Sequence, residues 1–265
     1  QIGADDVKGA NLALGNAVLG TLVLSSCFMI AALALLDPFL IQLGASETIL
    51  PFARDYMKII LIGFFFRPFA MLFHNLIRSE GNARVPMAGM IIGAVINTVL
   101  DAVFIIGFNF GIKGAAMATV VGEAVTTLYF LSYYFSGKNF LSFKIRNFIV
   151  RWSVMREILS IGVSAFTMSV ATCLSVVFVN KMCGTYGGDM AVSAFGIVNR
   201  LIMFALMPGV VVGMGLQPIV GFNYGAKRFE RILRAISISA VAATLFCSVS
   251  FVLGCFFPEI FIKVF

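Results

Sequence analysis

Residues 85–108 read VPMAGMIIGAVINTVLDAVFIIGF, an apolar run interrupted by a single charged side chain, Asp101. About 20 apolar residues in a helix are enough to cross the ~30 Å hydrocarbon layer of a bilayer, so this run predicts a membrane-spanning helix. The same pattern recurs along the chain, with most of the charged residues lying between the runs. It predicts seven spanning helices, at residues 11–36, 56–78, 85–108, 114–135, 157–181, 189–220 and 232–257.

The composition excludes a soluble fold. Hydrophobic residues make up 60% of the chain and charged residues 12%, with a mean hydropathy of +1.02. Soluble domains average roughly 45–50% hydrophobic and about 25% charged residues. The net charge of +7 comes from residues in short loops and not from one basic face with interleaved aromatic residues. We therefore expect an all-α integral membrane protein that contacts membrane lipid and binds no nucleic acid.

Short segments rich in proline, glycine or charge separate the predicted spans, and such short connections make neighbouring helices antiparallel. Cytoplasmic loops carry an excess of Lys and Arg. Of the 19 Lys and Arg residues, twelve lie on the side of residue 1 and five on the other, so residue 1 is predicted to be cytoplasmic. The separating segments are Asp37-Pro38, residues 79–82, residues 109–113, residues 184–189 and residues 223–225.

The longest and most basic loop, residues 137–156, is the natural boundary between two lobes and lies on the predicted cytoplasmic side. The parts on either side of it are related by a weak repeat. Gly3-Ala4-Asp5 resembles Gly225-Ala226-Lys227, and the ends of the apolar spans that follow also match, at offsets of about 220 residues. The alternative is that two such short matches arise by chance between apolar helices. If the repeat is real, its length holds six spans and predicts two halves of parallel orientation.

Three motifs are spread over nearly the whole chain. LIRSEGNAR at 76–84 is followed by Pro86, Asn97 and Asp101; GAAMAT occupies 114–119; and QPIVGFNYGAKR at 217–228 is followed by Arg231. None of them is specific by itself. Together, and in this order, they resemble the multidrug and toxic compound extrusion (MATE) transporters.

The resemblance implies a twelve-helix bundle with two pseudo-symmetric lobes of six helices each. It implies a monomeric secondary active antiporter in the plasma or inner membrane, which exports organic cations and drugs by alternating access in exchange for Na⁺ or H⁺. On this mapping residues 1–136 hold helices three to six, residues 137–156 the inter-lobe loop and residues 157–265 helices seven to nine. The fragment would then lack the first two and the last three helices, in agreement with the repeat.

Asp101 is the sharpest candidate for chemistry, because a carboxylate at membrane depth is costly unless it is protonated, paired or bound to a cation. No Lys or Arg lies within ten residues on either side of it. Asn97, four residues earlier, lies on the same helix face. Amide and carboxylate oxygens suit Na⁺ or a protonation switch. The alternative is that Asp101 lies near the external end of its helix and that Asn97 only makes a packing hydrogen bond.

In similar transporters a first-lobe site for cations and protons is built from Asn, Asp and Thr positions on the fifth and sixth helices. The resemblance places these positions at Asn97, Asp101 and Thr119. Asn75 on the preceding span is a further amide, although His74 competes for its place. The family also has a partner acid on its first helix, which this sequence does not contain.

Three more charged residues lie within predicted spans. Arg67 lies near the middle of its span, next to Pro68, and is expected to pair with Glu123 or Asp101, either as a functional counter-ion or as a structural ion pair. Glu123 follows Thr119 by four residues and is a second candidate for proton handling. Arg200 either lines the second lobe or pairs locally.

Enzyme motifs are missing, since the chain has no GxxxxGK[ST], GxSxG or HExxH sequence and only one histidine. We therefore expect no enzyme activity, no metal centre and no cofactor other than Na⁺ or H⁺ as the coupling ion. Two alternatives to drug export stay open. One is a flippase for lipid-linked saccharides of the same fold superfamily, and the other is a seven-helix membrane protein that transports nothing.

Overall fold

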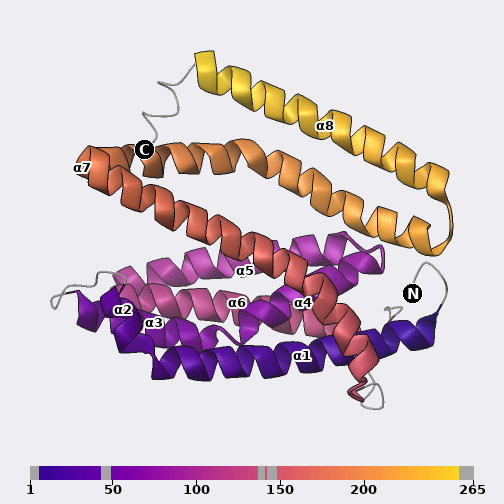
Figure 1. The fold of residues 1–265 in the computed structure, drawn as a ribbon. Coiled ribbons are helices and arrows are strands. Elements are labelled where there is room, and N and C mark those ends of the chain that lie inside the picture. Colours follow the sequence, from indigo (N-terminus) through magenta and orange to yellow (C-terminus); the bar gives the residue numbers. More distant parts are fainter. Residues whose placement is uncertain (1–5, 43–48, 137–140, 142–147, 257–265) are drawn as a thin grey trace. The chain divides into compact units, whose positions relative to one another are not determined.

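The computed structural model describes residues 6–42, 49–136, 141 and 148–256. Every element of these residues is a helix, and the chain forms two compact units, Gln1–Arg156 and Glu157–Phe265 (Figure 1). The elements are α1 (Val7–Ala34), α2 (Leu36–Gln42), α3 (Leu50–Gly63), α4 (Phe66–Ser79), α5 (Arg84–Asp101), the π-helix η2 (Ala102–Gly107), α6 (Ile112–Phe135), α7 (Trp152–Gly225) and α8 (Phe229–Phe256).

The predicted membrane spans are confirmed as helices. Among the described residues, six helices are long and apolar enough to cross a membrane, and α3 with α4 makes a seventh when this bent pair is one span. The span predicted at 85–108 is α5 continued by η2. The first span begins earlier than residue 11, at Val7, because the Asp6 carboxylate accepts a hydrogen bond from the Gly9 N–H and caps the helix.

The bend of 40° between α3 and α4 lies just before Pro68. α3 ends at Gly63 and α4 begins at Phe66, so Pro68 is the third residue of α4. The first N–H groups of a helix have no partner within it, and a proline there removes no hydrogen bond of its own helix. The bend in this span therefore lies ahead of Pro68 and not at it.

Asp37-Pro38 lies between two spans, as predicted, and forms part of the first turn of the short helix α2. The first turn tolerates proline. The Asp37 carboxylate accepts two hydrogen bonds of 2.7 Å, from Nε and Nη2 of Arg54 on α3. Bidentate pairs of this kind fix geometry as well as charge, and this one holds α2 against α3.

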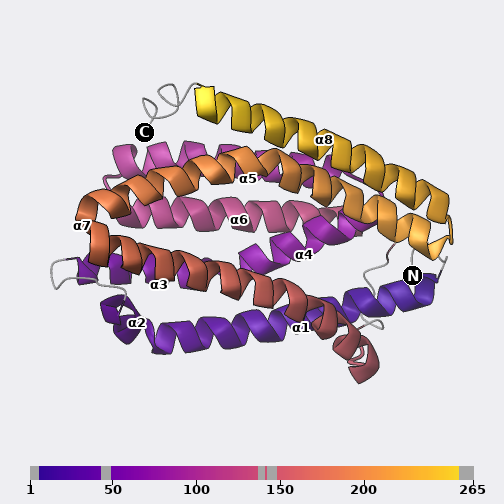
Figure 2. The same ribbon diagram turned by 45° about the horizontal axis from the view of Figure 1, so that its top comes forward.

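The second unit contains α7, from Glu157 on, and α8 (Figure 2). α7 turns back on itself at Gly188, which has φ 64° and ψ −165°. This backbone conformation is open almost only to glycine. The boundary predicted at residues 184–189 is thus confirmed, and the two arms of α7 are separate membrane spans.

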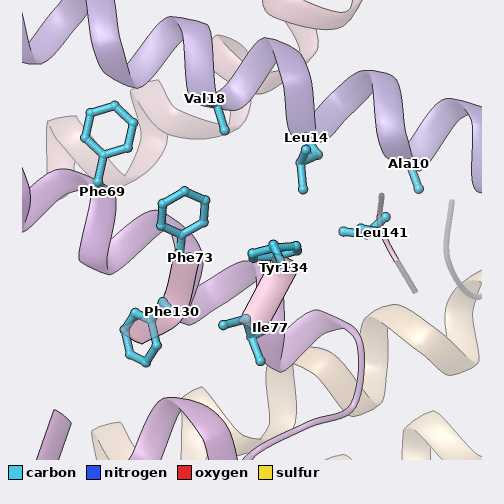
Figure 3. Close-up of a cluster of buried hydrophobic side chains, with 9 residues drawn as sticks. All are labelled: Ala10, Leu14, Val18, Phe69, Phe73, Ile77, Phe130, Tyr134 and Leu141. Atoms are coloured by element: carbon cyan, nitrogen blue, oxygen red, sulfur yellow. The ribbon is translucent and has the colours of Figure 1, made fainter. Parts of the chain in front are cut away.

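The core of the first unit is built from every fourth residue of α1, α4 and α6 (Figure 3). A spacing of four keeps side chains on one face of a helix. α4 therefore packs through one face, and α1 and α6 meet it with theirs. The buried residues are Ala10, Leu14, Val18, Phe69, Phe73, Ile77, Phe130 and Tyr134, with Leu141 beside them.

Candidate cation site

Close packing of α5 against α6 builds the candidate site, and both views show these helices side by side (Figures 1 and 2). Two glycines four residues apart, Gly89 and Gly93, face α6. A Cβ at Gly89 would collide with the Phe130 ring, and a Cβ at Gly93 would collide with the Thr126 hydroxyl. Small residues at this spacing let membrane helices approach closely.

Gly122 makes the matching approach from α6. A Cβ at Gly122 would lie 2.9 Å from the Gly93 carbonyl oxygen and 3.1 Å from Cβ of Asn97. Both distances are too short for a carbon in ordinary contact. The absence of a side chain at Gly122 therefore brings Asn97 within reach of α6.

Asn97 and Thr119 meet across this contact. Nδ2 of Asn97 donates a hydrogen bond of 3.4 Å to Oγ1 of Thr119, and the Thr119 hydroxyl donates in turn to the Ala115 carbonyl at 3.0 Å. The Thr119 hydrogen is thus used within its own helix, and its oxygen accepts from α5. Among the described residues, Oδ1 of Asn97 accepts no hydrogen bond, so a carbonyl-type oxygen stays available.

Asp101 is the last residue of α5, at the point where the α-helix continues as the π-helix η2. Its Oδ1 atom is buried and has no hydrogen-bond partner among the described residues. A buried carboxylate oxygen without a partner is costly. Short π-helical segments are frequent at functional sites, and this one begins directly after the candidate acid.

These three side chains offer a carboxylate, an amide oxygen and a hydroxyl oxygen on neighbouring helices. Hard cations such as Na⁺ prefer oxygen ligands of these kinds, and a proton on the carboxylate would remove the same charge. The unpartnered Oδ1 of Asp101 fits either ion. The arrangement is therefore chemically suited to bind one small cation, or one proton, at membrane depth.

The mid-membrane arginine pairs with Glu123. Nη1 of Arg67 lies 3.2 Å from Oε1 of Glu123. Of the two partners predicted for Arg67, Glu123 and Asp101, the structure therefore selects Glu123. Oγ1 of Thr127, four residues beyond Glu123, lies 3.0 Å from the Phe66 carbonyl oxygen, next to Arg67. α4 and α6 are thus joined by polar contacts at this level of the membrane.

One of the predicted site residues, Asn75, is not brought to Asp101. Asn75 lies one turn before the end of α4 at Ser79, whereas Asp101 lies 17 residues from the start of the following helix at Arg84. Because the two helices are antiparallel, a rise of 1.5 Å per residue puts the levels of these side chains roughly 20 Å apart. Arg200 lies on α7 in the other unit, and its exposed side chain makes no ion pair with a described residue.

Sequence reasoning missed a buried amide, Asn16, on α1. Its Nδ2 donates to the carbonyl oxygens of Leu12 and Ile149, at 2.9 and 3.1 Å, and its Oδ1 accepts from the Arg151 N–H at 2.9 Å. Asn16 thereby anchors the later part of the inter-lobe loop to α1. An amide inside an apolar span was the available signal. Nothing in the residue pattern predicted the π-helix after Asp101.

Comparison with known protein families gives one family model, described as MatE, which matches residues 1–103 and 158–265. Together these ranges cover well over half of the chain. They include the first unit as far as Asn97 and Asp101 and nearly all of the second unit.

The curated relatives are bacterial exporters. The multidrug export protein MepA of Staphylococcus haemolyticus (strain JCSC1435) is 28% identical over 251 residues, which are 93% of this chain and 55% of the relative. MepA of Staphylococcus aureus (strain NCTC 8325 / PS 47) is 26% identical over 261 residues, which are 96% of this chain and 56% of the relative. The chain spans about half the length of these relatives.

Solved structures of MATE transporters have the same fold. The MATE multidrug transporter DinF-BH in complex with rhodamine 6G is 37% identical, with a TM-score of 0.83, and the match covers 99% of this chain and 62% of that one. An outward-facing multidrug resistance MATE family transporter of the MOP superfamily is 26% identical, with a TM-score of 0.88, covering 97% and 58%. The helices described above therefore belong to a MATE-type bundle.

Proposed function

Because this chain belongs to the MatE family, we propose that the protein is a secondary active antiporter that exports organic cations, including drugs, in exchange for Na⁺ or H⁺. Its relatives are named as multidrug exporters, and one related structure holds rhodamine 6G. The substrates of this protein, its antiport mechanism and its coupling ion are inferences. They rest on the family and on the chemistry of the α5–α6 contact.

The observation that carries the proposal is the buried, unpartnered carboxylate oxygen of Asp101 beside the Asn97–Thr119 contact. A charge in this environment is stabilised by binding a cation or removed by a proton. Asp101 would hold the ion, with Asn97 and Thr119 supplying neutral oxygens. Binding at this site couples an ion gradient to transport when the two conformations of the protein differ in ion affinity.

The proposed topology follows from the charge distribution. Residue 1 and the loop 137–156 are placed on the cytoplasmic side of the cell membrane, where the Lys and Arg residues are in excess. Residues 1–136 then supply helices three to six of the first lobe, and residues 157–265 supply helices seven to nine of the second. The intact transporter is proposed to act as a monomer.

Replacing Asp101 by asparagine in the intact protein tests the proposal. Asparagine keeps the shape of the side chain but carries neither the charge nor the exchangeable proton, so efflux driven by an ion gradient should fall at least about tenfold, the effect of losing one charge-assisted ligand. Uptake of rhodamine 6G into everted membrane vesicles, whose cytoplasmic face points outward, is measured under separately imposed Na⁺ and pH gradients and identifies the ion.

The matched control is Asp55→Asn. Asp55 lies on α3 and pairs with Lys113 of α6 at 2.9 Å, and both side chains are about half exposed. An exposed pair contributes little to stability, so Asp55→Asn should retain coupled efflux. Unchanged coupling in the Asp101→Asn protein would show that the ion site lies elsewhere.

A further inference from the structure

The Arg67–Glu123 pair lies in the middle of the membrane and not at its surface. Glu123 is the twelfth of the 24 residues of α6, and Arg67 follows the bend in the α3–α4 span. The side chain of Arg67 is nevertheless 73% exposed, and that of Glu123 is 24% exposed. An arginine at this depth does not face lipid tails, because its desolvation is too costly. The exposed side of the pair therefore needs a polar partner, which the described residues do not supply.

The pair leaves much of its binding capacity unused. A guanidinium has five N–H donors and a carboxylate has two acceptor oxygens. Among the described residues only Nη1 of Arg67 and Oε1 of Glu123 are engaged, at 3.2 Å. The Nε and Nη2 groups of Arg67 and the Oε2 atom of Glu123 make no other hydrogen bond within the described part of the chain.

These free groups decide which charged ligand fits. A simple cation on the free Oε2 atom of Glu123 lies close to the positive guanidinium of Arg67, and the repulsion between the two charges at low dielectric is unfavourable. A simple anion on the free Nε and Nη2 groups of Arg67 is repelled in the same way by the Glu123 carboxylate. A molecule that carries a carboxylate close to its cationic centre satisfies both partners at once. The planar fork of arginine suits bidentate binding of such a carboxylate.

We infer that the Arg67–Glu123 pair is a substrate subsite for zwitterions, in which Arg67 binds the carboxylate of an organic cation and Glu123 faces its positive charge. This inference rests on the proposed export function and adds to it a substrate class and a residue that selects it. The pair and the ion site of Asp101 have no residue in common, although Glu123 lies about one helical turn from Thr119 on α6.

Two rhodamine dyes with the same amino-xanthylium ring test the inference. Rhodamine 19 carries a free carboxylate and is a zwitterion, and rhodamine 6G is its ethyl ester and a fixed cation. Their equilibrium dissociation constants for the intact purified protein are measured by fluorescence anisotropy in nanodiscs. The readout is the ratio of the two constants, which cancels general losses of folded protein.

In Arg67→Gln, the dissociation constant of rhodamine 19 should rise about tenfold relative to that of rhodamine 6G, as expected for one lost charge-assisted contact. Arg67→Lys keeps the charge without the planar fork and should give a smaller shift, and it serves if the glutamine variant does not fold. Lys113→Gln is the matched control, because it opens another ion pair of α6, with Asp55 at 2.9 Å, and should leave the ratio unchanged.

A selective shift in the Arg67 variants supports the subsite. Equal changes for both dyes, no change, or a wild-type protein that binds neither dye would overturn it, and equal changes would leave the pair as a structural tie between α4 and α6. Binding is measured without any gradient. A failure of gradient-driven efflux therefore counts against the proposed antiport and is distinguishable from a failure of the subsite.

Discussion

Replacing Gly122 by alanine tests whether close packing of α5 and α6 sets the geometry of the candidate ion site. The new Cβ would lie 2.9 Å from the Gly93 carbonyl oxygen, so the helices must separate by about 0.5 Å to restore ordinary contact. The Asn97–Thr119 hydrogen bond is 3.4 Å long. The same movement would lengthen it to about 3.9 Å, beyond hydrogen-bond range.

The energetic cost has two parts. Overpacking of a close contact costs about 1–3 kcal/mol, and an interhelical hydrogen bond in a membrane protein contributes about 0.6 kcal/mol. We expect Gly122→Ala to lower the thermal unfolding midpoint of the intact protein in detergent. It should also weaken coupling-ion affinity, because Asn97 and Thr119 no longer hold each other in place.

The control for this experiment is Gly107→Ala, in η2. A Cβ at Gly107 would meet no described atom within 4 Å, so this variant should match the wild type in both measurements. The unfolding midpoint is read from size-exclusion profiles after heating, with and without the coupling ion. If Gly122→Ala and Gly107→Ala behave alike, the close approach of α5 and α6 does not control the site.

Two further substitutions probe single contacts. Thr119→Val keeps the side-chain shape but removes its oxygen, so the affinity for the coupling ion should fall about tenfold. Thr119→Ser keeps the hydroxyl and should retain this affinity. Equal ion affinities of the two variants in titrations would refute a ligand role for Thr119. Asn16→Leu removes the partners of the Ile149 carbonyl and the Arg151 N–H. It should destabilise the protein by about 1–2 kcal/mol, and an unchanged thermal unfolding midpoint would show that this anchor contributes nothing.

Helix boundaries were predictable where backbone chemistry is local. Gly188 and Gly111 have positive φ, as does Asn109, and each lies in a segment that the sequence marked as a connection. Left-handed conformations favour glycine and asparagine whatever the tertiary context. The short helix α2 was missed, because its ends are set by packing of Leu40 against Leu61 and by the Arg54–Asp37 pair, both of which are contacts between helices.

The candidate site was predictable only in part. The proximity of Asn97 and Asp101 could be predicted from a single helix, because a spacing of four residues puts both side chains on one face. Their relation to Thr119 came from resemblance to a family, and the structure supplies the physical cause in the Gly93–Gly122 contact. Asn75 was included for its chemistry, but antiparallel packing puts it at another depth.

The sequence by itself determined that this chain lies in a membrane, where its spanning helices fall and which residues carry charge within them. These properties depend on the length and polarity of continuous segments, because lipid makes each span satisfy its own backbone hydrogen bonds. Only the tertiary structure decided that Arg67 pairs with Glu123, that Asn97 meets Thr119 and that a π-helix follows Asp101. Partners across helices depend on how each helix is rotated and how closely it packs, and small residues such as Gly93 and Gly122 set both through contacts between distant parts of the chain.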